Sequence, residues 1–154
     1  MAATPRAPAA AAAAAARILA LALPLLLLLP PPAALLPAQL GGVQDSPVDD
    51  PGVQEAAAFA VLAYSKASPG PVYFKELRIV KAASQVVEGM KYFLTVEVVS
   101  TQCEKKSGVE LTEAELQLCP IAPRAEQQRY TCHFTVWSRP WLNELQLLGS
   151  SCVA

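Results

Sequence analysis

Two strand-like runs joined by a glycine-terminated connector constrain the fold of this chain more than any other feature. Residues 72–80 and 90–98 are both rich in β-branched and aromatic side chains, and the segment 85–89 between them ends in glycine. This pattern predicts a β-hairpin with an exposed tip. Val86 and Val87 occupy the tip, where turn chemistry favours Asn, Asp or Pro. Apolar side chains at such an apex indicate a candidate contact surface.

The register of this hairpin follows from its apolar pattern. The run 90–98 alternates apolar and polar residues, which predicts a strand with one buried face. Leu77 and Ile79 reach that face if they pair with Val96 and Leu94, respectively. We expect this register, or a bulge near the tip that produces it. The charged residues beside them then face solvent: Glu76 and Arg78.

A helix is predicted upstream of the hairpin. Asp50 fits the N-cap and Pro51 the first helical position, and the pattern continues to Lys66. The helix ends before 68–71, because the two prolines there cannot continue the hydrogen-bond ladder. Small and apolar residues recur at helical spacing and can approach a sheet closely: Val53, Ala56, Ala57, Ala60, Ala63 and Tyr64.

The last part of the chain predicts a second hairpin closed by a disulfide. Its two strands cover 128–137 and 144–152, and Cys132 and Cys152 are equidistant from Leu142 between them. In an antiparallel hairpin turning at that residue, the two cysteines are cross-strand neighbours within reach of a disulfide.

The two remaining cysteines are Cys103 and Cys119. Pairing them is one of three possible connectivities, and an even cysteine count is typical of a small secreted domain. We interpret the polar segment between them as an appendage outside the core. Together these elements predict an α+β fold, with one long helix packed on a four- or five-stranded antiparallel sheet.

The first 38 residues are mostly Ala, Leu and Pro. A basic start followed by a short apolar run is typical of a secretory signal peptide, and a signal anchor is the alternative. We interpret 1–38 as a signal peptide cleaved near Ala34 or Ala38, and 39–154 as one secreted domain. Residues 39–44 have no periodic pattern and are expected to form a flexible leader.

The residue types weigh against catalysis and nucleic-acid binding. His133 is the only histidine; it follows Cys132, and neighbours in a strand point to opposite faces, so they cannot form a nucleophile–base pair. The sequence has no phosphate-binding, nucleophile-elbow or metal-ligand motif. All thirteen acidic residues follow residue 38, against ten of the twelve basic ones, and there is no basic run. We expect neither an enzyme nor a cofactor or metal site.

Pro140-Trp141 lies at the apex of the second hairpin. The tryptophan either folds back to cap the core or serves as an exposed binding anchor, for which its side chain is well suited. Neighbouring hairpins of one sheet can place both apices at the same end, which the leader could also reach. These segments therefore define a candidate interaction surface.

The same segments resemble motifs of the cystatin family. Gln85-Val86-Val87-Glu88-Gly89 matches the Gln-x-Val-x-Gly motif, Pro140-Trp141 matches the Pro-Trp pair, and Gly41 stands at the N-terminal glycine position. The resemblance extends from about Leu40 to Cys152 and includes the four-cysteine tail. It is closest to the cystatin M (E/M) branch of the secreted type 2 group.

The resemblance implies a tight-binding, reversible, competitive inhibitor of papain-like cysteine proteases such as cathepsins L, V and B. Leu40 would fill the apolar S2 pocket, and Gly41 would let the backbone pass the catalytic cysteine closely. A non-inhibitory binding module with the same fold is the alternative, and we expect a monomer without membrane association after signal cleavage. The residues implied to contact the protease are Leu40, Gly41, Gln85, Val86, Val87, Glu88, Gly89, Pro140 and Trp141.

One departure from the family concerns legumain. Family members that inhibit this asparaginyl endopeptidase present an asparagine after the helix, where this chain has Ser68-Pro69-Gly70-Pro71. A missing specific polar contact is costly in such a pocket, which weighs against legumain inhibition. Asn143 is the only asparagine and no glycosylation motif follows it.

Overall fold

A computed structural model describes residues 41–154 of the chain. The predicted signal peptide, its candidate cleavage sites Ala34 and Ala38, and Leu40 lie outside the described residues. Within the described range, no helix has the length and apolar character needed to cross a membrane.

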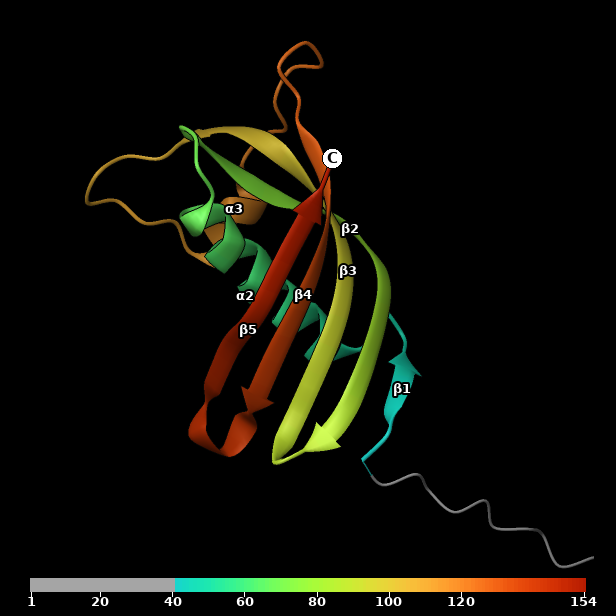
Figure 1. The fold of residues 1–154 in the computed structure, drawn as a ribbon. Coiled ribbons are helices and arrows are strands. Elements are labelled where there is room, and N and C mark those ends of the chain that lie inside the picture. Colours follow the sequence, from blue (N-terminus) through green and yellow to red (C-terminus); the bar gives the residue numbers. More distant parts are fainter. Residues whose placement is uncertain (1–40) are drawn as a thin grey trace, which may run out of the picture. The chain divides into compact units, whose positions relative to one another are not determined.

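The architecture is a five-stranded antiparallel sheet with one long helix, α2, against one face (Figure 1). Strand neighbours in the sheet are also neighbours in sequence, and helix α2 lies in the connection between β1 and β2. The α+β prediction is therefore confirmed. The strands are β1 (Val43–Ser46), β2 (Val72–Val87), β3 (Gly89–Glu104), β4 (Arg129–Arg139) and β5 (Glu144–Val153).

Helix α2 (Pro51–Ala67) begins where its capping residues predict. The Asp50 carboxylate accepts hydrogen bonds from the backbone N–H of Gly52 at 2.9 Å and of Val53 at 3.2 Å. Pro51 opens the helix, where its missing N–H leaves no donor unpaired. At the other end, the Ser65 hydroxyl accepts from the Phe74 N–H at 2.7 Å and ties the helix to β2.

The core lies between the small-residue face of α2 and the inner face of the sheet. The helix contributes alanines and valines whose small side chains permit close packing, and Ala63 and Tyr64 of the predicted face lie at its partly exposed margin. Fully buried sheet residues include Leu94, Val96 and Phe134. The buried helix residues are Val53, Ala56, Ala57, Ala60, Val61 and Ser65.

The expected register of the first hairpin is wrong. Ile79 pairs with Val96 rather than with Leu94, and Ala82 takes Leu94 instead. The register shifts at three places, all well away from the tip: Val72/Phe74, Glu76/Arg78 and Ile79/Lys81. A bulge inserts an extra residue into one strand, and the local sequence does not mark where it occurs.

The expected flexible leader is also wrong in part. Val43 and Gln44 begin β1, which pairs antiparallel with the end of β2, opposite Gln85 and Ser84 respectively. The Ser46 and Ser84 hydroxyls are 2.7 Å apart across the same pair of strands. The four-residue strand has no apolar periodicity to reveal it, because three of its residues are exposed.

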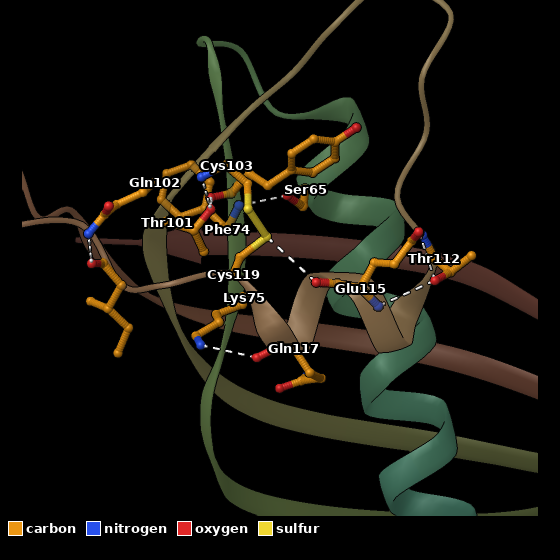
Figure 2. Close-up of a disulfide and its surroundings, with 12 residues drawn as sticks. Ser65, Phe74, Lys75, Thr101, Gln102, Cys103, Thr112, Glu115, Gln117 and Cys119 are labelled. Carbon is orange, nitrogen blue, oxygen red and sulfur yellow. Dashed lines mark hydrogen bonds between the residues drawn. A yellow bond between two sulfur atoms is a disulfide. The ribbon is translucent and has the colours of Figure 1, made fainter.

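The segment between Cys103 and Cys119, whose disulfide is drawn in Figure 2, is mostly exposed, but Leu116 and Cys119 belong to the core, so the segment is not entirely an appendage. Its short helix α3 (Glu113–Leu118) begins with a capping box between Thr112 and Glu115. Leu116 on this helix is 1% exposed and belongs to the main hydrophobic cluster. The polar residues around Leu116 in the sequence give no indication that it belongs to the core.

Both disulfides join the expected cysteines: hairpin symmetry predicted the pair Cys132–Cys152, and Cys103–Cys119 is the pair that this choice leaves. Cys132 and Cys152 face each other directly across β4 and β5, with Cα atoms 4.0 Å apart. The Cα atoms of Cys103 and Cys119 are 5.8 Å apart. An irregularity beyond Thr135 shifts the remaining pairs by one residue, so the turn is centred between Trp141 and Leu142 rather than on Leu142.

Candidate functional site

Three segments that are far apart in sequence lie at one end of the sheet (Figure 1). They are the entry to β1, the β2–β3 tip and the 3-10 turn η2 (Pro140–Leu142) between β4 and β5. The strand order brings them together, because β1 pairs with β2 and β3 pairs with β4. We call these three segments the contact edge.

Gly41 and Gln85 join the first segment to the tip. The Gln85 side-chain amide donates a hydrogen bond to the Gly41 carbonyl oxygen at 2.7 Å, and Val43 pairs with Gln85 in the sheet. Gly41 has a φ of +91° and open space around its missing Cβ. The side chain of Gln85 therefore holds the backbone entering β1, a role that the motif alone did not specify.

The β2–β3 tip presents its valines to solvent. Val86 is 58% exposed and Val87 is 39% exposed, and Val87 pairs directly with Gly89, leaving Glu88 as the single residue at the apex. Gly89 has a φ of +92°, which other residues rarely adopt. The tip is thus a very tight turn with an apolar side facing outward.

Gly89 also permits close contact with the second hairpin. A Cβ at this position would clash with the Ser138 carbonyl oxygen and would lie 3.3 Å from Cη2 of Trp141. The tip backbone therefore packs directly on β4, and the Trp141 ring lies beside it. The structure brings Gly89 and Trp141 together, as the hairpin argument predicted.

The second turn holds its tryptophan outside the core. Trp141 is 59% exposed and Leu142 is 55% exposed, so the tryptophan does not fold back as a core cap. Pro140 starts the 3-10 turn, and Asn143 closes it with a φ of 50° while its N–H donates to the Pro140 carbonyl oxygen at 3.0 Å. Asparagine tolerates this left-handed conformation well.

Two residues that the sequence reasoning missed complete the contact edge. The Trp137 indole Nε1 donates to the Glu88 carbonyl oxygen at 2.7 Å. The Arg139 guanidinium lies over the Trp137 ring, 4.3 Å from its centroid, and contacts the Glu144 carboxylate at 2.7 Å. Trp137 lies next to the buried Val136 on β4, and no local signal in the sequence links it to the tip.

The cysteine and histidine side chains considered above have structural surroundings within residues 41–154. All four cysteines are in disulfides, and no group of three His, Cys, Asp or Glu residues between 41 and 154 could hold a metal ion. His133 is an exposed strand residue whose Nδ1 lies 3.1 Å from the Thr95 hydroxyl. The contact edge is suited to burying apolar side chains against a partner protein.

Comparisons with known proteins agree with this geometry. The sequence model of the cystatin domain matches residues 41–141. A cystatin from Pseudechis australis is 48% identical over 122 residues, which cover 79% of this chain and 84% of that protein. Dimeric human cystatin F superposes with a TM-score of 0.66 at 29% identity, covering 78% of this chain and 92% of its own. A salivary cystatin from the soft tick Ornithodoros moubata gives 0.57 at 25% identity, covering 74% and 98%.

A helix-backed antiparallel sheet with three loop segments at one end defines a protein-binding module. The domain match and the 48% identity then identify its family: the chain belongs to the cystatins. Membership of this family implies inhibition of cysteine proteases rather than enzymatic activity. The placement in the cystatin M branch stays a prediction from the sequence motifs.

Proposed function

We propose that the protein is a secreted, reversible, tight-binding competitive inhibitor of papain-like cysteine proteases of the cathepsin L, V and B type. The contact edge enters the active-site cleft of the protease and blocks it. The observation that carries this proposal is the exposure of Val86, Val87 and Trp141 at one end of a rigid sheet. Their apolar area becomes buried when the cleft closes around them.

The mechanism depends on a surface that is largely formed before binding. The two turns are anchored in the sheet, so little conformational entropy is lost on association. Gly41 is held by Gln85 and by the adjacent strand β1, which restrains the leader close to the tip. In the proposed complex Leu40 occupies the S2 pocket, as the family resemblance implies, and the missing Cβ of Gly41 lets the backbone pass the catalytic cysteine.

The remaining features of the proposal concern location, assembly and range of targets. Residues 1–38 are removed as a signal peptide, so that a monomeric domain of residues 39–154 acts outside the cell. Legumain is not among the proposed targets. The exposed loop after α2 contains Ser68, Pro69, Gly70 and Pro71, and thus lacks the asparagine that this protease requires at its S1 pocket.

The test is titration of papain and cathepsin L with the refolded domain and with Trp141→Ala. The parent protein should inhibit stoichiometrically, and the variant should bind at least about 30-fold more weakly, since buried tryptophans of interfaces contribute about 2 kcal/mol or more. The loss should come mainly from a faster off-rate. Leu118→Ala is the matched control, because Leu118 is 83% exposed and lies on α3, away from the contact edge.

Two outcomes would contradict the proposal. The first is an absence of inhibition at micromolar concentrations of a folded parent protein. The second is inhibition that survives combined substitution of Gly41, Val87 and Trp141, which would assign binding to another surface. A folded protein that inhibits nothing would instead favour a non-inhibitory module of the same fold.

A further inference from the structure

The two hairpin turns of the contact edge are joined by side chains that belong to neither sequence motif. Trp137 on β4 reaches across the start of β3 and donates its indole N–H to the Glu88 carbonyl oxygen at 2.7 Å. These two residues are separated by 49 positions in the chain. Next to this bond, the backbone of Gly89 packs on the Ser138 carbonyl without room for a Cβ. The first tip is therefore held against β4 both by packing and by a directed hydrogen bond.

Arg139 holds the same indole from the side of the second turn. Its guanidinium lies 4.3 Å from the centroid of the Trp137 ring, a distance suited to a cation–π contact. The guanidinium also contacts the Glu144 carboxylate at 2.7 Å, and the side chains of this ion pair are 25% and 43% exposed. Arg139 and Glu144 flank the Pro140–Leu142 turn on its two sides.

These contacts form a continuous chain from one turn to the other. It runs from Glu88 through Trp137 and Arg139 to Glu144, and we call it the loop brace. Each link is modest by itself, because it lies near solvent. All of them nevertheless restrict the same indole ring, so the brace limits how far the tip can move relative to the turn that carries Trp141.

We infer that Trp137 is a positioning residue that sets the spacing of the two turns for protease binding. This inference rests on the proposed inhibitory function. Without the brace, the tip samples positions that do not fit the cleft, and only the competent fraction of molecules binds. The apparent Kd rises by the inverse of that fraction. A smaller competent fraction lowers the association rate constant, whereas loss of a direct contact such as Trp141 raises the dissociation rate constant.

The decisive variant is Trp137→Phe, which keeps an aromatic ring under Arg139 but removes the indole donor. We expect kon for papain to fall about 3- to 10-fold, the size expected for one lost hydrogen bond. The koff should stay within about twofold, and the thermal midpoint should fall by only about 3–6 °C, because the core is unchanged and one hydrogen bond is lost. Arg139→Gln should lower kon in the same direction.

Arg78→Gln is the matched control. It breaks another arginine–glutamate pair on the same sheet, in which Arg78 contacts Glu97 at 2.8 Å, without touching either turn. Neither rate constant should change. An unchanged kon for Trp137→Phe would overturn the inference, and so would a faster koff with unchanged kon, because Trp137 would then be a contact residue.

Hydrogen exchange of the two indole N–H groups tests the brace without any protease. In the unmodified protein, the indole proton of Trp137 should exchange more slowly than that of Trp141, which is 59% exposed. Equal exchange rates would refute the brace itself. If the parent protein does not inhibit papain, the proposed function fails, while this measurement still decides whether Trp137 is held.

Discussion

Gly89→Ala is the substitution whose effect the structure defines most closely. The residue has a φ of +92°, where an L side chain is strained by about 1–2 kcal/mol. In addition, the new Cβ would come within 3.0 Å of the Ser138 carbonyl oxygen, so the tip or β4 must move. Forcing extra volume into a closely packed site costs about 1–3 kcal/mol more.

A second glycine separates these two effects. Gly108 has a φ of +78° but no atom within 4 Å of its Cβ position, so Gly108→Ala carries the backbone strain alone. The free energy of unfolding of Gly89→Ala should therefore be lower than that of Gly108→Ala by about 1–3 kcal/mol. For a domain of this size, the difference corresponds to roughly 4–12 °C in the thermal midpoint.

Urea and thermal unfolding of the two variants, followed by papain titration, would measure this. Gly89→Ala should also weaken inhibition, since relief of the clash moves the tip away from Trp141. Gly108→Ala should inhibit as the parent does. If the two variants matched in both stability and inhibition, the close packing of the tip on β4 would not exist in solution, and the reasoning would fail.

Two further predictions concern the interior. Leu116→Ala should lower the free energy of unfolding by about 2–5 kcal/mol, because Leu116 is 1% exposed. Leu118→Ala should change it by less than about 0.5 kcal/mol in the same urea titration. Equal effects of the two substitutions would show that Leu116 is not a core residue. Burial raises the pKa of the Glu76 carboxyl above its ordinary value of 4.5. At a pH above the raised pKa of the folded state, the ionised carboxylate therefore destabilises the fold. This destabilisation disappears as the pH falls to the ordinary pKa, where the carboxyl is protonated in both states. Glu76→Gln should therefore stabilise the protein at pH 7 and lose that advantage below the ordinary pKa, as unfolding curves at a series of pH values would show.

Much of the fold could be predicted because its signals are local. Asp50 and Pro51 mark the start of α2 through capping chemistry that involves only the next few residues. Alternation along 90–98 reports which face of β3 is buried, because successive strand residues point to opposite sides. The pairing of Cys132 with Cys152 follows from hairpin symmetry alone. The hairpin pattern marked Val86, Val87 and Trp141 as tip residues, and the resemblance to cystatin motifs supplied the remaining residues of the contact edge.

Other features arise from contacts between distant segments, and no local pattern encodes them. The irregularities in β2 change its register against β3 at places that depend on how the two strands pair. Leu116 becomes a core residue only because the disulfide segment folds back on the helix and sheet. Strand β1 forms because β2 offers it a free edge rather than because its own residues favour a strand.

The sequence by itself therefore determined helix α2, the two hairpins of this cystatin, the disulfide pairing and the turn residues at the two hairpin tips. The tertiary structure decided how that edge is held. The bond between Trp137 and Glu88 joins residues 49 positions apart, and the Gly89 backbone meets Ser138 only after both hairpins have formed. Such contacts depend on the register and twist of the whole sheet, because a shift of one residue would turn the indole to the other face.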